Sequence, residues 1–242
     1  MIRVILHVLI MDFGKDILNC RNKLTEKKDY KGVILYNDGS LYEGYIAQDH
    51  PNGKGRKLYA DSRSYFGDFV DGVPHGKGKM ANPSGAFYEG DWYEGVREGH
   101  GFEEIEDETY DGEYKNDQRN GHGVWKKNGD EYEGMIVNGL PEGKGIFTWK
   151  SGKKYDGEWK EGKANGKGKM TYTDGAIYEG YFFEGERHGE GMLETAEGDK
   201  YEGRWNYNKK EGEFTISGKG KSTVTTMWKD DDIINVQYNP GY

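Results

Sequence analysis

The chain has 242 residues, of which 33% are hydrophobic and 14% aromatic; it contains 39 glycines and carries a formal net charge of −9. The hydrophobic share is below that of an ordinary packed core, whereas the aromatic share is too high for a disordered chain. The negative charge argues against a general attraction to nucleic acid or anionic lipid, although it leaves room for a local basic face.

The segment 1–29 contains the one strongly apolar run of the sequence, MIRVILHVLIM. A run of about eleven residues is too short for a membrane-spanning helix. No small-residue cleavage pattern follows it, so a secretory signal is not expected, and Met11 is an alternative start. We expect residues 1–29 to cap one end of the fold or to bind a partner. The single cysteine, Cys20, lies here and excludes an internal disulfide.

A tyrosine recurs eight times along the chain at nearly constant intervals. The period is about 23 residues, and a fixed period in this range is the signature of a repeat architecture. We number each repeat from this tyrosine, which is position zero. The eight tyrosines are Tyr42, Tyr65, Tyr88, Tyr110, Tyr132, Tyr155, Tyr178 and Tyr201.

The residue types within each repeat follow a strand–turn–strand pattern. Position two is glycine and position four is large and apolar in all eight repeats, and position one is acidic in seven, with Phe66 the exception. This alternation predicts a strand with one covered face. Position seven is always Gly, Asp or Asn, which predicts a tight reversal. Position eleven is always glycine and position thirteen is glycine in seven repeats, with Phe214 the exception, so a second strand is expected from about position eleven.

Each repeat is therefore expected to be a β-hairpin. The bulky rings at positions zero and four are expected to lie over the glycines at positions two, eleven and thirteen, because a strand glycine leaves space that a ring can cover. The predicted fold class is all-β: an elongated single-layer antiparallel sheet of successive β-hairpins with a short N-terminal apolar cap segment. The array is expected over residues 30–220, as eight repeats plus a leading half repeat, and a C-terminal cap strand and tail over 221–242.

This pattern resembles the MORN family (membrane occupation and recognition nexus). The resemblance rests on runs such as Tyr88–Trp92 (YEGDW), Tyr155–Trp159 (YDGEW) and Tyr178–Phe182 (YEGYF), and it covers roughly residues 30–220. It implies a solenoid of hairpins. Many similar proteins made almost only of these repeats belong to ciliary axonemes, including radial spokes, or to cortical cytoskeleton. Some bind a peptide along an aromatic groove and some self-associate, and the family name implies contact with membranes.

The sequence offers no catalytic residues, no metal ligands and no cofactor motif, so we do not expect an enzyme. The histidines after His7 lie within the repeats, and no serine, threonine or cysteine that departs from the repeat pattern stands beside them as a nucleophile. The run Asp230-Asp231-Asp232 lacks the ligand spacing of a calcium loop. The glycine pairs lack the Lys-Ser/Thr ending of a phosphate-binding loop.

Two sets of residues are candidates for binding. The first is a basic stripe at position twelve, which either pairs with the acidic residues at position one or docks an acidic protein or lipid headgroups: Lys54, Lys77, His100, His122, Lys144 and Lys167. The second is an aromatic groove, whose residues either bind a partner or only build the structural layer: Tyr88, Trp92, Trp125, Trp159, Phe182 and Trp205.

These observations favour a non-catalytic structural scaffold or adaptor that binds other proteins along its β-surface. From the resemblance, the expected partners are axonemal or cytoskeletal proteins, and the expected location is intracellular, in a cilium or the cytoskeleton. Self-association and weak contact with anionic lipid are further interactions to consider, and nucleic acid is not an expected partner. The alternative function is a peripheral membrane module that binds phosphoinositides.

Overall fold

The computed structural model describes residues 29–238, and every regular element in this range is a β-strand. Within the same range, no helix is long and apolar enough to cross a membrane. The described residues form two compact units. Unit 1 comprises residues 29–85 and 91–96, and unit 2 comprises residues 86–90 and 97–238.

Each unit is an antiparallel sheet in which every strand pairs with the next strand along the chain. Unit 1 holds β1 (Tyr30–Leu35), β2 (Leu41–Ala47), β3 (His50–Leu58), β4 (Ser64–Val70) and β5 (Val73–Ala81). The next strand, β6 (Phe87–Tyr93), has residues 87–90 in unit 2 and residues 91–93 in unit 1.

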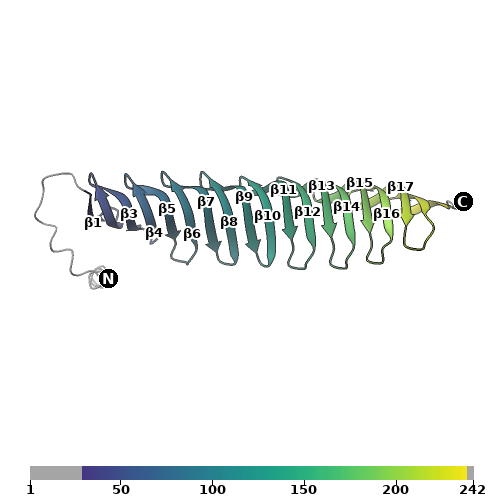
Figure 1. Cartoon of the computed structure of the whole chain (residues 1–242), viewed down its shortest axis with the longest axis horizontal. Coiled ribbons are helices and arrows are strands. Elements are labelled where there is room, and N and C mark those ends of the chain that lie inside the picture. Colours follow the sequence, from purple (N-terminus) through teal and green to yellow (C-terminus); the bar gives the residue numbers. More distant parts are fainter. Residues whose placement is uncertain (1–28, 239–242) are drawn as a thin grey trace, which may run out of the picture. The chain divides into compact units, whose positions relative to one another are not determined.

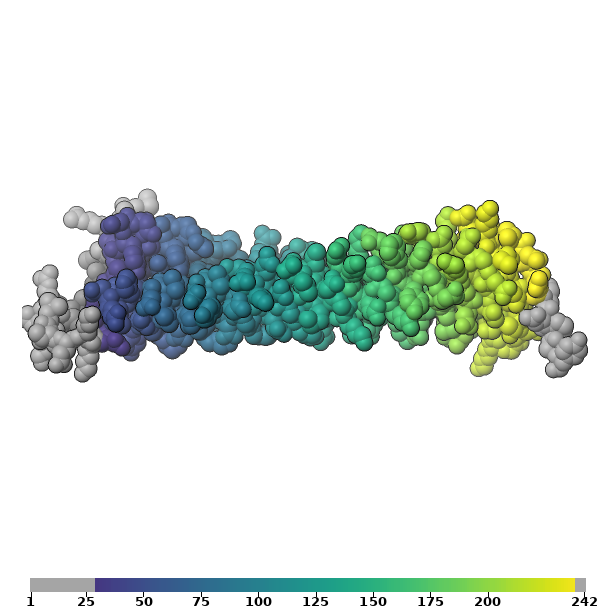
Figure 2. All heavy atoms as spheres, turned by 90° about the horizontal axis from the view of Figure 1, so that it is seen from above, coloured from purple at the N-terminus to yellow at the C-terminus, as the bar shows by residue number. Residues whose placement is uncertain are grey.

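From Arg97 in β7 onward, the strands of unit 2 follow one another in chain order, as their colours from teal to yellow show (Figure 1), and the atoms in Figure 2 follow the same order of colours. The prediction of an all-β, single-layer array of hairpins is confirmed within each unit. The strands are β7 (Val96–Ile105), β8 (Glu108–Lys115), β9 (Gln118–Lys127), β10 (Asp130–Val137), β11 (Leu140–Thr148), β12 (Lys154–Lys160), β13 (Lys163–Thr171), β14 (Ile177–Phe183), β15 (Glu186–Glu194), β16 (Lys200–Asn206), β17 (Lys209–Ser217), β18 (Val224–Lys229) and β19 (Asp232–Tyr238).

The predicted reversal at position seven is confirmed, and position six takes part in it as well. In the turn between β10 and β11, Asn138 has a φ of 50° and Gly139 a φ of 81°. Positive φ at both central residues is the geometry of a type I′ turn, whose twist matches that of the flanking strands. Position six is left-handed in every repeat although it is never glycine, a requirement that the residue types did not reveal.

The turn at the other end of the hairpin accounts for two repeat lengths, which differ by a single residue. The shorter repeats close this turn tightly, since Ile105 pairs with Glu108 and Lys127 pairs with Asp130. The longer repeats use a wider loop instead, such as the loop in which the Tyr172 amide donates to the Ala176 carbonyl at 2.9 Å. The difference in length is therefore absorbed in a loop, and the aromatic columns stay in step.

The tyrosine rings lie over the glycines at positions two and thirteen, as predicted. Tyr155 is fully buried, and its hydroxyl donates to the Glu158 carbonyl at 2.9 Å. A methyl group added to Gly168 would lie 2.5 Å from this ring, and one added to Gly157 would lie 2.6 Å from its hydroxyl. Contacts this short do not occur between real atoms, so both positions exclude any side chain.

The glycine at position eleven has a different role from the one predicted. Its φ is positive in all eight repeats, for example 67° at Gly143, and the register of the two strands shifts beside it, between Gly134 and Ile136. The residue is therefore the glycine of a β-bulge and does not make room for a ring. The bulge also leaves the backbone amide at position twelve without a partner in the neighbouring strand of the hairpin. A carboxylate at position three can accept a hydrogen bond from this amide, as Glu158 does from the Lys167 amide at 3.2 Å.

Position four links each repeat to the one before it. The Trp159 ring packs edge-to-face between Tyr132 and Tyr155, with centroid distances of 5.4 and 5.2 Å. Its indole N–H donates to the Gly145 carbonyl at 2.9 Å. Such pairs add about 0.5–1.5 kcal/mol beyond the area they bury. The resulting chain of rings replaces a two-layer core.

The two ends depart from the regular pattern. The leading half repeat forms β1 as predicted. Near the other end, Phe214 is fully buried, and a methyl group on Gly203 would lie 2.7 Å from its ring. Phe214 thus fills the space that a column tyrosine occupies elsewhere, and Tyr201 is only half-buried. After β18, which was expected, β19 forms a further strand. The predicted N-terminal cap or partner-binding segment covers residues 1–29, of which residues 1–28 lie outside the described residues.

Candidate functional site

The predicted groove residues are mostly part of the buried aromatic layer. In unit 2, four of them are less than 9% exposed; in unit 1, Trp92 is 7% exposed, and its indole N–H donates to the Gly78 carbonyl at 2.9 Å. Only Trp125, in unit 2, is half-exposed. The five buried residues therefore have the structural role of building the aromatic layer, and their contact with a partner stays a prediction. The four buried in unit 2 are Tyr88, Trp159, Phe182 and Trp205.

A group of partly exposed aromatic side chains extends from Trp125 along unit 2, and we call it the aromatic ledge: Trp125, Phe147, Trp149 and Tyr172. The Trp125 and Phe147 centroids are 6.2 Å apart, and Phe147 and Trp149 are 4.7 Å apart. The Lys153 ammonium lies 4.6 Å from the Trp149 centroid and 5.6 Å from that of Tyr172. Trp149 and Tyr172 both occupy position seventeen of their repeats. The sequence pattern could have identified them as part of a site, because aromatic residues recur at this position.

The ledge lies on the same face as the tyrosine layer. Phe147 is the cross-strand neighbour of both Tyr132 and Tyr155, and Trp125 is the neighbour of Tyr132 on its other side. Residues directly opposite each other on paired strands point to the same face. This row therefore stands beside the buried rings and presents its outer part to solvent.

A network of charged side chains orients Trp125. One carboxylate oxygen of Glu108 accepts from the Trp125 indole at 2.8 Å and from Arg119 at 2.7 Å, and the other accepts from Lys127 at 2.9 Å. Burial would raise the pKa of the Glu108 carboxyl, but these hydrogen bonds outweigh it and lower the pKa to about 2. Arg119 also pairs with Glu103 at 2.6 Å. The carboxylate therefore stays ionised and holds the indole in place.

The basic stripe lies on the opposite face, and part of it is paired with acidic residues. In unit 1, Lys54 pairs with Asp68 at 3.1 Å and Lys77 pairs with Asp91 at 2.7 Å. Both carboxylates belong to position three, not to position one as the sequence pattern predicts. For Lys54 the difference follows from the regular register of β3 and β4, which places Lys54 directly opposite Asp68. Docking by the stripe stays a prediction.

In unit 2 the rest of the stripe has mixed surroundings. His100 lies 3.3 Å from Asp111, which does belong to position one. His122 faces Met135 across the strands, and Lys144 faces Glu158. Lys167 lies over the Tyr181 ring, 5.3 Å from its centroid. The stripe residues of unit 2 thus do not form a uniformly cationic surface.

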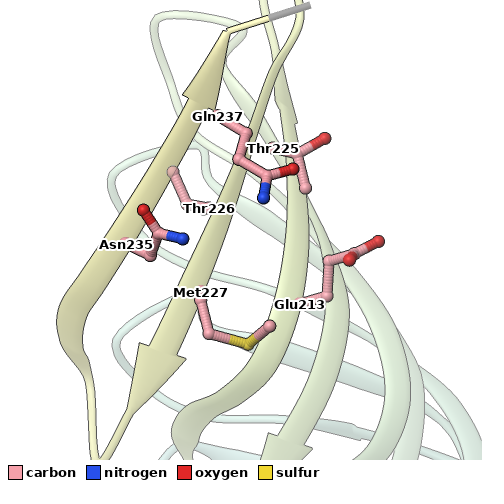
Figure 3. A pocket seen from close by; sticks show the side chains of 6 residues that line it. All are labelled: Glu213, Thr225, Thr226, Met227, Asn235 and Gln237. Carbon is pink, nitrogen blue, oxygen red and sulfur yellow. The ribbon is translucent and has the colours of Figure 1, made fainter.

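Two hollows in unit 2 differ in size and lining residues. The larger hollow has a volume of about 610 Å³ and is shallow. Its lining includes three glycines, the three lysines Lys144, Lys167 and Lys169, and three carboxylates. The smaller, of about 20 Å³, lies between β17, β18 and β19, where Glu213, Met227 and Asn235 are among the lining residues (Figure 3). A space of this size holds about one water molecule. Among residues 29–238, no three His, Cys, Asp or Glu side chains are grouped to hold a metal ion.

The chain belongs to the MORN repeat family. The family model matches it eight times in succession, over residues 42–62, 65–87, 88–107, 110–131, 132–154, 155–177, 178–200 and 201–213. MORN repeats generally mediate interactions with proteins or membranes, and the family is generally non-catalytic.

No curated protein matches the chain significantly. Among solved structures, one that is similar is described as the SAS-4 (dCPAP) TCP domain in complex with a proline-rich motif of Ana2 (dSTIL) of Drosophila melanogaster. It is 11% identical, the alignment covers 86% of this chain and 98% of that chain, and the TM-score is 0.30. At this TM-score the similarity supports no argument about partners.

Proposed function

We propose that the protein is a non-catalytic scaffold that binds other proteins through the aromatic ledge of unit 2. The observation that carries the proposal is the partial exposure of Trp125, Phe147, Trp149 and Tyr172 on one face. Aromatic side chains are enriched at protein interfaces and dominate their binding energy. The four rings lie in one row beside a rigid sheet, which suits an extended partner segment.

The ledge is also pre-organised for binding. Glu108 holds the Trp125 indole, and Lys153 lies against the rings of Trp149 and Tyr172. Side chains whose rotamers are already held lose less conformational entropy when a partner binds. These contacts favour a binding surface over rings that are exposed by chance.

We further propose an intracellular setting in a ciliary axoneme, such as a radial spoke, or in the cortical cytoskeleton. Support for this setting comes only from the likeness to MORN proteins made almost entirely of repeats. A fluorescent fusion in the cells of origin tests it. Signal along axonemes or cytoskeletal structures is the expected result, and signal confined to membranes would contradict it.

The ledge is tested by proximity labelling with three forms of the full chain. Trp149→Ala removes a ledge ring, and Tyr181→Ala removes an exposed aromatic ring from the other face as a matched control. We expect some proteins labelled by wild type and control to drop about tenfold with Trp149→Ala, as for an interface hot spot. Identical labelling by all three forms would refute the ledge as the binding surface.

The membrane alternative is tested by co-sedimentation with vesicles with and without phosphoinositides. The stripe lysines Lys54 and Lys77 are already paired with carboxylates, which weakens attraction to anionic headgroups. We therefore expect little lipid-dependent pelleting. Strong pelleting at low salt that Trp149→Ala leaves unchanged would favour the membrane function instead.

A further inference from the structure

Unit 1 carries a second surface, on the face opposite the tyrosine layer. Its central row runs across four strands in register, from Val33 through Glu43 and Arg56 to Phe66. Lys31 and Leu35 share this face of β1 because they lie two residues to either side of Val33. We call the group of Lys31, Val33, Leu35, Arg56 and Phe66 the Phe66 surface.

The apolar side chains of the Phe66 surface are strongly exposed. Phe66 is 66% exposed, Leu35 is 74% exposed and Val33 is 53% exposed. Position one is acidic in the other seven repeats, so Phe66 stands where the other repeats have a charged residue on the solvent-exposed face of the strand. An aromatic ring at this exposure contributes little to the core. Grouped apolar exposure of this kind marks an interaction site.

Two cations on the same face have no acidic partner. Neither Arg56 nor Lys31 forms an ion pair with any residue in the described range, although Glu43 is the cross-strand neighbour of Arg56. Lys31 lies only over the Tyr45 ring, 5.1 Å from its centroid. By contrast, nearby Lys54 is paired with Asp68. The Phe66 surface therefore combines exposed apolar groups with unneutralised positive charge.

We propose that the Phe66 surface binds an acidic segment of a partner protein that also carries apolar side chains. A carboxylate of the segment pairs with the Arg56 guanidinium, whose planar donors match a carboxylate in two parallel hydrogen bonds. A second carboxylate meets Lys31, and apolar side chains pack on Phe66 and Leu35. The complementarity of charge and apolar area selects this partner over a basic or a purely polar one.

An anionic membrane fits this surface less well. A flat bilayer would meet Glu43 and Asp68 together with the cations, and Asp68 already neutralises Lys54. A peptide can instead place each carboxylate beside a chosen cation and avoid the acidic positions. The surface lies in unit 1 and shares no residue with the aromatic ledge, so its test and that of the ledge can fail independently.

The experiment is selection of a random peptide library, displayed on phage, against the full chain. Phe66→Glu is the test variant, because it restores the acidic residue found at position one in the other repeats and should fold. Phe183→Glu is the matched control, since it changes another exposed phenylalanine, in β14 of unit 2. Circular dichroism and urea unfolding establish that both variants are folded.

We expect wild type and Phe183→Glu to recover peptides that Phe66→Glu does not, and we expect these peptides to be rich in Asp or Glu together with apolar residues. A synthetic copy should bind with salt-sensitive affinity, reduced about tenfold by Arg56→Gln. Recovery of no Phe66-dependent peptide, or of peptides without acidic enrichment, would overturn the proposal. So would Phe66-dependent binding to phosphatidylcholine vesicles containing phosphatidylserine in the absence of peptide binding.

Discussion

Replacing Gly168 by alanine should destabilise unit 2, because the new methyl group overlaps with a buried tyrosine ring. The new methyl group would lie 2.5 Å from both a ring carbon and the hydroxyl oxygen of the buried Tyr155. The ring must move, which strains the packing by about 1–3 kcal/mol. It also loses the hydrogen bond to the Glu158 carbonyl, worth about 1 kcal/mol. We therefore expect a loss of about 2–4 kcal/mol in the free energy of unfolding.

The matched control is Gly185→Ala, at a turn where a methyl group meets no atom within 4 Å but φ is 88°. This change isolates backbone strain, which costs about 1–2 kcal/mol. Urea unfolding followed by tryptophan fluorescence measures both variants by linear extrapolation. The reasoning about ring space is wrong if Gly168→Ala costs no more than Gly185→Ala.

Three further predictions concern the ring chain and the charged network. Phe214→Gly should lower the free energy of unfolding by less than the roughly 3–5 kcal/mol that is typical of deleting a buried phenylalanine ring, because the Tyr201 ring can move into the space over Gly203 that Phe214 leaves. A variant structure in which Tyr201 is no more buried than in the wild type would contradict this. Trp159→Phe should cost about 1–3 kcal/mol in urea unfolding, because it leaves the Gly145 carbonyl without its donor; a neutral effect would show that water replaces the indole. The lowered pKa of Glu108 contributes stability that is present above its ordinary pKa of 4.5 and is lost as the pH falls toward about 2; acid titration of stability should flatten over this range in Glu108→Gln, and an unchanged profile would count against the network.

The hairpin plan and the tyrosine-on-glycine layer could be predicted because both depend on residues close together in each repeat. Position seven accepts a left-handed backbone by residue type, and a fixed glycine two residues after a tyrosine leaves space for its ring. Position six could not be predicted in the same way. Residues such as Glu161 and Tyr207 have no preference for positive φ and adopt it because the type I′ turn imposes it on both central residues.

The candidate sites were predicted less completely. Trp125 and Trp159 look equivalent as large aromatic residues, yet one is half-exposed and the other is buried. The two residues differ in their place in the repeat: Trp159 is at position four and packs between Tyr132 and Tyr155, whereas Trp125 is at position fifteen, directly across the strands from Tyr110 and Tyr132. Trp149 and Tyr172 each follow the end of a strand, so the sequence pattern indicates only loop residues. The structure shows that the Lys153 ammonium lies against both rings and connects them.

By itself, the amino-acid sequence determined the repeat, its strands and the match of each tyrosine to the glycines at positions two and thirteen. These features follow from the volume of each side chain and from the backbone conformations that each residue accepts, and both can be read from the residue type. The tertiary structure alone decided that position eleven is a bulge, that Lys54 meets Asp68 at position three, and that Phe66 stands exposed beside Arg56. The physical reason is register: the partner of each outward side chain depends on how its strand is aligned with the next strand, and residue types alone do not fix that alignment.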